Sequence, residues 1–195
     1  MSSQIAQAFG NDPFFILISC LLSLRAKDRM TLPVSLQLFK HIKNVYDLAQ
    51  AQPELLESII HPLGFYKQKT KIIQHVAREL ITRFNGAVPK TYNELISIKG
   101  IGPKTANLVL SVAYGIPAIC VDIHVHRISN RLGLVHTTTP EQTQQELERL
   151  LPRDYWSLWN EWLVLWGQHI CAPRSPKCTA CPLAPHCAYG TKKLL

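Results

Sequence analysis

The chain has 195 residues, 47% of them hydrophobic, and its 21 Lys and Arg outnumber its 13 Asp and Glu to give a net charge of +8. This length allows one large domain or two small ones with a substantial core, and the composition excludes a disordered or low-complexity protein. Only 17% of the residues are charged, so few acidic neighbours neutralise the excess of basic side chains. The charge therefore indicates a polyanionic partner. Nucleic acid is the preferred candidate, and an acidic membrane surface is the alternative.

The N-terminal region carries no recognisable targeting signal. Residues 1–13 contain no Lys or Arg, and the apolar run over 14–22 is shorter than the roughly 20 residues that span a bilayer. We therefore expect a cytoplasmic protein, nucleoid-associated in a prokaryote, with no membrane partner. In that compartment the six cysteines indicate thiols or metal ligands rather than disulfides. Cys20 and Cys120 lie in apolar stretches and are expected in the core.

The hydrophobic pattern predicts an all-α protein, because no window shows the alternation that is typical of a strand. Asn11-Asp12-Pro13 is a typical helix start, and Asn85-Gly86 is a typical helix end. Four tryptophans at helical spacing are expected to pack in a core, namely Trp156, Trp159, Trp162 and Trp166. In chain order, we expect helices over 13–24, 30–43, 53–60, 68–84 and 91–96, a helix that follows the glycines at 100 and 102 and ends at 114, and helices over 123–132, 140–150 and 154–170.

Four cysteines follow the last long helix with the spacing C-x6-C-x2-C-x5-C, and these are Cys171, Cys178, Cys181 and Cys187. Thiolates so close in sequence can surround one compact centre. Structural zinc sites usually pair two short chelating loops, whereas only one C-x2-C unit is present here. The spacing therefore favours a [4Fe-4S] cluster, with zinc or a set of unligated thiols as the alternatives.

The sequence of residues 95–106 predicts two helices joined by a hairpin that contains glycines. Gly100 and Gly102 permit backbone conformations that other residues avoid, and they let a phosphate approach the amides that open the second helix. The segment resembles the helix-hairpin-helix element, which grips one DNA strand without reading its sequence. An ordinary corner between two helices with a glycine turn is the alternative.

Three motifs together resemble the endonuclease III family of DNA glycosylases, and the resemblance covers about residues 14–189. They are the Gly-x-Gly-x-Lys-Thr-Ala of residues 100–106, the Val-Asp-x-His of residues 121–124 and the spacing of the four cysteines. The resemblance implies a helix-hairpin-helix DNA glycosylase fold, with the active site in the groove between two domains. It implies a six-helix barrel domain over 6–116, with its hairpin at about 91–114, and an iron–sulfur cluster domain made of 1–5 and 117–195, with its cluster loop over 171–187.

Lys104 and Asp122, 18 residues apart, are the predicted catalytic pair. A lysine amine can attack the sugar and form a Schiff base, and a carboxylate stabilises the positive charge that develops as the glycosidic bond breaks. The alternatives are a phosphate-binding role for Lys104 and a plain helix N-cap role for Asp122. His124 is expected to support the pair from beside the catalytic groove.

The family resemblance also suggests contacts to the DNA around a flipped base. Relatives commonly carry a glutamine where this chain has Arg25 and a leucine where it has Phe65, so both departures bear on substrate preference. The alternatives are a plain phosphate contact for Arg25 and a core position for Phe65. Lys67, Lys69 and Lys71 are expected either to contact DNA or to form a solvated helix face. The predicted DNA-contacting residues are Arg25, Leu63, Phe65, Gly100, Gly102, Thr105, Arg174 and Lys177.

The resemblance implies a monomeric, bifunctional DNA glycosylase and apurinic/apyrimidinic lyase of base excision repair that removes damaged pyrimidines from double-stranded DNA. A thymine or uracil mismatch glycosylase of the same fold is one alternative. A non-catalytic DNA-binding or redox-sensing iron–sulfur protein is the other. Family members usually have a longer N-terminal helix on the cluster domain, and residues 1–10 are too short to replace it, so we expect that domain to be less covered.

Overall fold

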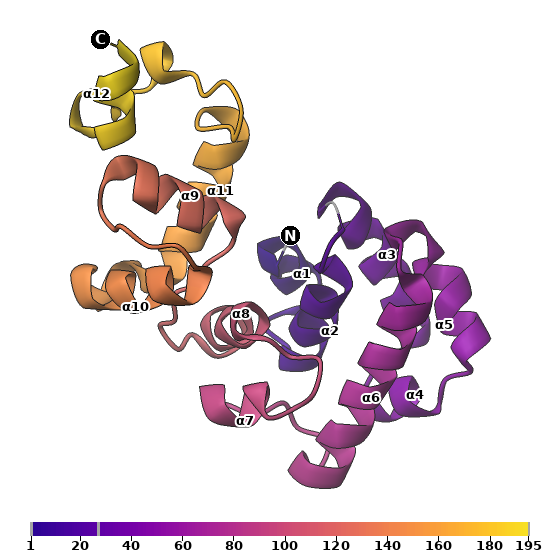
Figure 1. The fold of residues 1–195 in the computed structure, drawn as a ribbon. Coiled ribbons are helices and arrows are strands. Elements are labelled where there is room, and N and C mark those ends of the chain that lie inside the picture. Colours follow the sequence, from indigo (N-terminus) through magenta and orange to yellow (C-terminus); the bar gives the residue numbers. More distant parts are fainter. Residues whose placement is uncertain (1, 27, 195) are drawn as a thin grey trace. The chain divides into compact units, whose positions relative to one another are not determined.

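The computed structural model describes residues 2–26 and 28–194, and the regular elements of these residues are all helices (Figure 1). The predicted all-α class is confirmed. The chain divides into two compact units, Met1–Ile116 and Pro117–Leu195. Met1, Lys27 and Leu195 fall within the domain ranges predicted from the sequence but lie outside the described residues.

Helix α2 (Pro13–Ser23) is the centre of the first unit. It is apolar on all sides and almost wholly buried, as expected for a helix surrounded by others. Its start is fixed by Asp12, whose carboxylate accepts a hydrogen bond from the amide of Phe14 at 2.8 Å. It packs against α1 (Ser2–Phe9), α3 (Asp28–His41), α6 (Tyr66–Phe84) and α8 (Pro103–Tyr114). The unit is completed by α4 (Val45–Gln50), α5 (Pro53–Ile60), a short 3-10 turn η1 (His61–Leu63) and α7 (Tyr92–Ile96).

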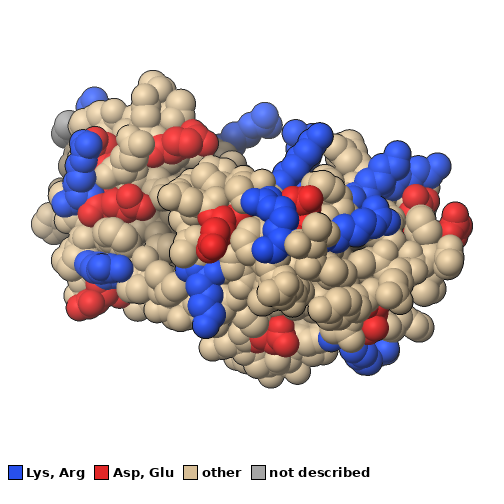
Figure 2. Space-filling view, turned by 90° about the horizontal axis from the view of Figure 1, so that it is seen from below, with Lys and Arg blue, Asp and Glu red and all other residues tan. Residues whose placement is uncertain are grey.

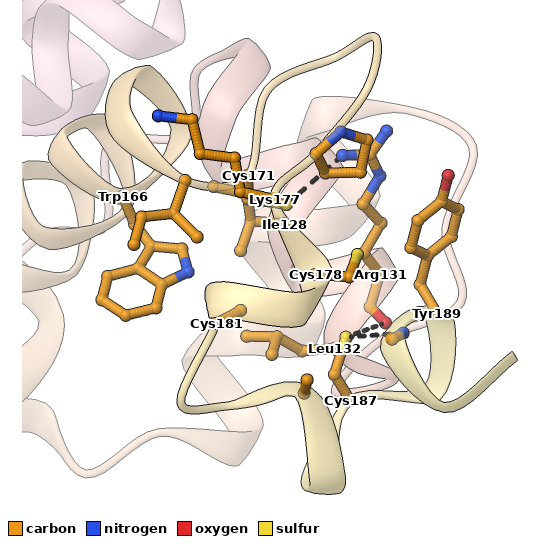
Figure 3. A pocket seen from close by; sticks show the side chains of 14 residues that line it. Ile128, Arg131, Leu132, Trp166, Cys171, Lys177, Cys178, Cys181, Cys187 and Tyr189 are labelled. Carbon is orange, nitrogen blue, oxygen red and sulfur yellow. Dashed lines mark hydrogen bonds between the residues drawn. The ribbon is translucent and has the colours of Figure 1, made fainter. Parts of the chain in front are cut away.

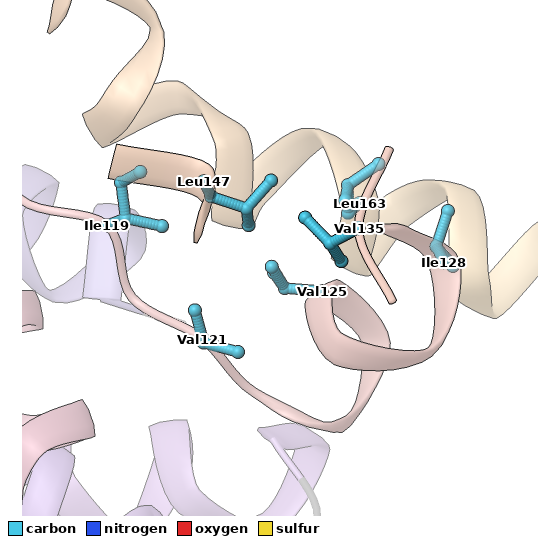
Figure 4. Close-up of a cluster of buried hydrophobic side chains, with 7 residues drawn as sticks. All are labelled: Ile119, Val121, Val125, Ile128, Val135, Leu147 and Leu163. Atoms are coloured by element: carbon cyan, nitrogen blue, oxygen red, sulfur yellow. The ribbon is translucent and has the colours of Figure 1, made fainter. Parts of the chain in front are cut away.

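The second unit is built around α9 (Ile123–Leu132), which packs against α10 (Pro140–Leu150), α11 (Trp156–His169) and α12 (Ala188–Leu194). Three 3-10 turns lie between or beside them, namely η2 (Arg153–Tyr155), η3 (Cys178–Ala180) and η4 (Ala184–His186). Its core consists of Ile119, Val121, Val125, Ile128, Val135, Leu147 and Leu163 (Figure 4). Because Val125 and Ile128 belong to α9, this core fixes the helix whose first residues follow Asp122.

Three short helices were not predicted from the sequence, namely α1, α4 and α12. Each has eight residues or fewer, so its apolar pattern is too short to stand out. Helix α1 packs against α2, α3 and α8 of the first unit, whereas the sequence analysis assigned residues 1–5 to the second domain. Ile5, near the middle of α1, is fully buried. The division of the chain thus differs from the expected ranges at the N-terminal end.

The tryptophans of α11 follow the prediction with one exception. Trp156, Trp159 and Trp166 pack against the core of the second unit, as expected. Trp162 is 44% exposed, so the prediction that it packs in the core is wrong, and its ring lies against those of Tyr155 and Trp159. Cys20 and Cys120 are both buried, as predicted. Among the described residues, no helix is long and apolar enough to cross a membrane.

Candidate functional site

The predicted glycine hairpin connects α7 to α8. Gly100 has φ +106°, a conformation that side chains rarely adopt, and a Cβ there would lie 3.0 Å from the side chain of Ile72. The turn is held by a hydrogen bond from the amide of Ile101 to the carbonyl of Ile98 at 3.0 Å. Gly102 is the N-cap of α8, and a Cβ on it would meet no atom within 4 Å. The hairpin therefore leaves open space at the N-terminal end of α8, where backbone amides favour an anion.

Lys104 is the second residue of α8, directly after Pro103, and its side chain is exposed. The structure thus places this amine in the first turn of the helix, as the sequence analysis expected. Thr105, the next residue, is only 3% exposed. Its hydroxyl is therefore not at the surface, and a DNA contact at this position would use the backbone.

Asp122 is the N-cap of α9. Its Oδ1 accepts hydrogen bonds from the amides of His124 at 2.8 Å and Val125 at 2.9 Å. The carboxylate is half-buried, and the next residue, Ile123, is 73% exposed. Asp122 therefore has the capping role that was the alternative to catalysis, and two amides fix its orientation. Lys104 belongs to the first unit and Asp122 to the second.

His124 connects the start of α9 to the four-cysteine segment through Arg127. Arg127 Nη2 lies 3.1 Å from His124 Nδ1 and donates to the carbonyl of Cys171 at 2.9 Å. Burial and the neighbouring charge of Arg131 lower the pKa of Arg127 from its ordinary value. A Cβ on Gly167 of α11 would lie 2.3 Å from His124 Nδ1 and 2.8 Å from Arg127 Nη2. The glycine is therefore required for the close packing of both side chains.

The four cysteines line a single cavity in the second unit (Figure 3). The cavity has about 370 Å³ of unfilled space, part of it open to solvent. Cys171 follows α11, Cys178 starts η3, and Cys181 and Cys187 directly follow η3 and η4. Other residues that line it are Ile128, Arg131, Leu132, Trp166, Ile170, Pro176, Lys177, Ala184, Tyr189 and Gly190.

Hydrogen-bond donors point at two of the cysteine sulfurs. Arg131 Nη1 lies 3.3 Å from the sulfur of Cys171, and the amide of Gly190 lies 3.3 Å from the sulfur of Cys187. Arg131 also donates to the carbonyls of Ala172 at 2.7 Å and Pro173 at 2.8 Å. Among the described residues, no three metal-ligating side chains lie close enough to share one metal ion. The four cysteines therefore share one cavity, and two of their sulfurs face N–H groups of the kind that stabilise thiolate sulfur.

Two surface loops of the first unit carry predicted DNA contacts. Arg25 follows α2 and Phe65 precedes α6, and both have left-handed backbones, with φ 56° and 47°. Arg25 is exposed and Phe65 is 61% exposed, whereas Leu63 is only 5% exposed. The expectation that Leu63 contacts DNA does not fit this burial, because its side chain packs inward from η1. Phe65 is the apolar side chain that this loop presents to solvent.

The basic side chains near these loops and near the cysteines differ in exposure. Lys67 and Lys71 are exposed, but Lys69 is only 6% exposed, so both predictions for Lys69, a DNA contact or a solvated face, are wrong. Arg174 and Lys177 are exposed, as a contact to DNA requires. On the face drawn in Figure 2, Lys and Arg form several separate groups with acidic side chains between them.

The bonds by which Arg127 and Arg131 join α9 to the cysteine segment were not predicted from the sequence, and neither was the burial of Lys69. The signal for the two arginines was present, because they are four residues apart on one helix and therefore share a face. The sequence held no comparable signal for Lys69, which stands among other lysines on α6.

Comparisons with known proteins agree with this arrangement. Residues 18–153 match the family described as the HhH-GPD superfamily base excision DNA repair protein. The endonuclease III of Thermotoga maritima is 45% identical over 182 residues, which cover 93% of this chain and 85% of that protein. A structure of a trapped endonuclease III–DNA covalent intermediate has a TM-score of 0.89 and 33% identity, and the match covers 100% of this chain and 95% of that chain. A thermostable thymine-DNA glycosylase has a TM-score of 0.85 and 26% identity, with 93% of this chain and 86% of that chain covered.

Proposed function

This chain belongs to the HhH-GPD superfamily of base excision DNA repair proteins, and we propose that it is a bifunctional DNA glycosylase and apurinic/apyrimidinic lyase. Its substrate is double-stranded DNA that contains an oxidised pyrimidine or an abasic site. The protein acts as a monomer on DNA in the cytoplasm, at the nucleoid in a prokaryote.

The pair Lys104 and Asp122 carries this proposal. Lys104 presents an exposed amine in the first turn of the helix that follows the glycine hairpin. Asp122 presents a carboxylate that two amides hold in one orientation. DNA binding alone needs neither group at these positions, whereas amine attack on a sugar needs both a nucleophile and an anion that stabilises positive charge.

In the proposed reaction, the damaged base first leaves the helix stack, because its glycosidic bond is inaccessible inside the duplex. The neutral amine of Lys104 attacks the anomeric carbon, and the bond from that carbon to the base breaks. Opening of the sugar ring then gives a Schiff base between Lys104 and the sugar. Loss of a proton from the neighbouring carbon expels the 3′-phosphate, and hydrolysis of the Schiff base regenerates the amine.

Asp122 acts while the glycosidic bond is breaking, when positive charge accumulates on the sugar. A carboxylate whose orientation is already set stabilises this charge without reorganisation during the reaction. The amides of His124 and Val125 provide that orientation. His124 helps to position Asp122, because its backbone amide donates to the Asp122 carboxylate while its ring contacts Arg127.

The DNA backbone is gripped at several places on the surface. The open N-terminal end of α8 at Gly100 and Gly102 accepts a phosphate, with the backbone of Thr105 in the same turn. Arg25 and Phe65 occupy the space that a flipped base leaves in the stack. Arg174 and Lys177 add contacts to phosphates from the cysteine segment.

Cys171, Cys178, Cys181 and Cys187 hold a [4Fe-4S] cluster in this proposal. The support is that all four cysteines line one cavity, together with donors from Arg131 and Gly190 that point at two of the sulfurs. When bound, the cluster ties the segment 171–187 together at four points and thereby fixes the basic residues that it carries.

The decisive test is borohydride reduction, which converts a Schiff base into a stable protein–DNA adduct. The wild-type protein should be trapped on duplexes that contain an abasic site, thymine glycol or dihydrouracil. Lys104→Ala should lose the adduct but still bind DNA, because the hairpin backbone and the remaining cations hold the phosphates. Lys99→Ala is the matched control, because it removes an exposed lysine from the same hairpin.

Two outcomes would contradict the proposal. An adduct that survives Lys104→Ala places the nucleophile elsewhere, with the N-terminal amine as the first group to examine. Tight binding without any adduct from the wild-type protein would favour the alternative of a non-catalytic DNA-binding or redox-sensing protein.

The second candidate function is removal of thymine or uracil opposite guanine. It is favoured by the similarity to the thymine-DNA glycosylase structure at 26% identity. Duplexes with thymine or uracil opposite guanine, assayed beside the three substrates above, separate the two functions. A mismatch glycosylase excises normal thymine or uracil opposite guanine faster than it excises oxidised pyrimidines.

A further inference from the structure

The two surface loops that carry Arg25 and Phe65 are connected by one buried side chain. Lys69 lies one helical turn after Phe65 on α6 and is 6% exposed. Its Nζ donates to the carbonyls of Leu22 at 2.9 Å and Leu24 at 2.5 Å, which are 47 and 45 residues earlier in the chain. Its backbone amide donates to the carbonyl of Phe65 at 2.9 Å. The side chain of Lys69 thus ties the end of α2, directly before Arg25, to the first turn of α6, directly after Phe65.

These bonds complete the C-terminal end of α2, where the last carbonyls of a helix lack partners within the helix. Ser23 Oγ donates to the carbonyl of Cys20 at 2.7 Å, and the amide of Leu24 donates to the carbonyl of Leu21 at 3.4 Å. The amide of Ala26 bonds the carbonyl of Ser23 at 3.0 Å. The carbonyls of Leu22 and Leu24 remain, and Lys69 satisfies both. Arg25 therefore follows a helix end whose last two carbonyls are bonded by a side chain of α6.

Burial of the Lys69 amine disfavours its charged form. Burial lowers the pKa of Lys69, and the charge of nearby Arg25 lowers it further. Arg25 and Phe65 also both hold left-handed backbones, which an ordinary side chain adopts only when its surroundings impose it. Lys69 lies between the two, because its side chain bonds the carbonyl directly before Arg25 and its backbone amide bonds the carbonyl of Phe65.

A flipped base leaves a gap in the stack and an unpaired partner on the other strand. If Arg25 and Phe65 both enter the duplex there, the distance between the two side chains must match the distance between the gap and the unpaired base. Resting on the proposed function, we propose that Lys69 is a positioning residue that holds the Arg25 and Phe65 loops at a fixed separation, so that both side chains enter the duplex at one flipped nucleotide. Lys69 itself does not contact the DNA, because it is buried.

The test compares Lys69→Met, which keeps the buried stem and removes the donors, with Lys40→Met, which removes an exposed lysine near the end of α3. Lys69→Met should slow excision from duplex DNA by about tenfold or more, because Arg25 and Phe65 would no longer compensate for the stacking lost when the base leaves the duplex. Excision of the same lesion from single-stranded DNA should change less than about twofold, because no stack has to be opened. Lys40→Met should leave the ratio of duplex to single-strand rates at the wild-type value.

Two further measurements separate positioning from a general loss of structure. In the wild-type background, Arg25→Ala and Phe65→Ala should have non-additive effects on duplex excision, and in the Lys69→Met background their effects should become independent. Hydrogen exchange of the amides of Ala26 and Gly64 should become faster in Lys69→Met, whereas exchange in α9 and α11 should remain unchanged. If Lys69→Met is unfolded at the assay temperature, Lys69→Gln, which retains one donor group, takes its place.

An active Lys69 variant with the wild-type rate ratio and the wild-type coupling would overturn this inference and leave the proposed function intact. A wild-type protein that excises no base from any duplex would overturn the proposed function, and the inference with it.

Discussion

Arg127 donates from Nη2 to the carbonyl oxygen of Cys171 at 2.9 Å, and this bond joins helix α9 to the first cysteine of the cavity. The same nitrogen lies 3.1 Å from Nδ1 of His124, whose amide bonds the carboxylate of Asp122. A continuous set of contacts therefore runs from the proposed catalytic carboxylate to the proposed cluster, all within the second unit. A substitution at Asp122 should therefore alter the cysteine segment, and a substitution at Cys171 should alter the position of the Asp122 carboxylate.

Gly167→Ala should disrupt this set of contacts without touching either end. Its Cβ would lie 2.3 Å from the His124 ring, so His124 and Arg127 must move. We expect a loss of unfolding free energy of about 1–3 kcal/mol, typical of overpacking, and slower excision by the folded variant. Urea unfolding and single-turnover excision measure the two effects. Gln168→Ala, at the adjacent exposed position of α11, is the control and should match the wild type in both.

Asp122→Asn should separate the capping role of this residue from its catalytic role. Asparagine caps a helix about as well as aspartate, so the melting temperature should stay near the wild-type value. The negative charge is lost, so base excision should slow by about a hundredfold or more. Asp122→Ala should lose the same activity and, in addition, about 1 kcal/mol of stability with the cap. Equal excision by Asp122→Asn and the wild type would show that Asp122 is a cap alone.

Cys178→Ser should remove a bound iron–sulfur cluster. The protein purified anaerobically should absorb broadly at about 400 nm and contain iron, and the variant should lose both signals. DNA binding should weaken as well, since Arg174 and Lys177 lose their support. Thr179→Ser, an exposed position between Cys178 and Cys181, is the control. A colourless wild-type protein that contains zinc and is fully active would contradict the cluster assignment.

Lys69 should leave a pH signature in the stability of the protein. Because burial lowers its pKa in the folded state, the unfolded chain binds the proton more tightly just below 10.5. The contribution of Lys69 to the unfolding free energy therefore rises as pH increases through the lowered pKa toward 10.5. Urea unfolding over this alkaline range should show the wild type gaining stability relative to Lys69→Met as pH rises. No such trend should appear against Lys67→Met.

Much of this protein is determined by residues that are close in sequence. Asp12 and Asp122 begin their helices through bonds to amides two or three residues later, and the pattern of each cap is visible in the sequence. The glycine hairpin and the cysteine spacing are local in the same sense, since each motif spans fewer than 20 residues. The resemblance carried by these motifs predicted the fold class and the family, and both are confirmed.

The tertiary structure decided which side chains are buried and what they bond. Lys69 resembles its neighbours Lys67 and Lys71 in sequence, yet it alone of the three is buried, because its partners are carbonyls 45 and 47 residues away. Arg127 likewise bonds Cys171 from 44 residues away. Leu63 turns inward and Phe65 outward two residues apart. Capping and helix periodicity depend on neighbours along the chain, whereas burial depends on which distant segments the fold brings against a side chain.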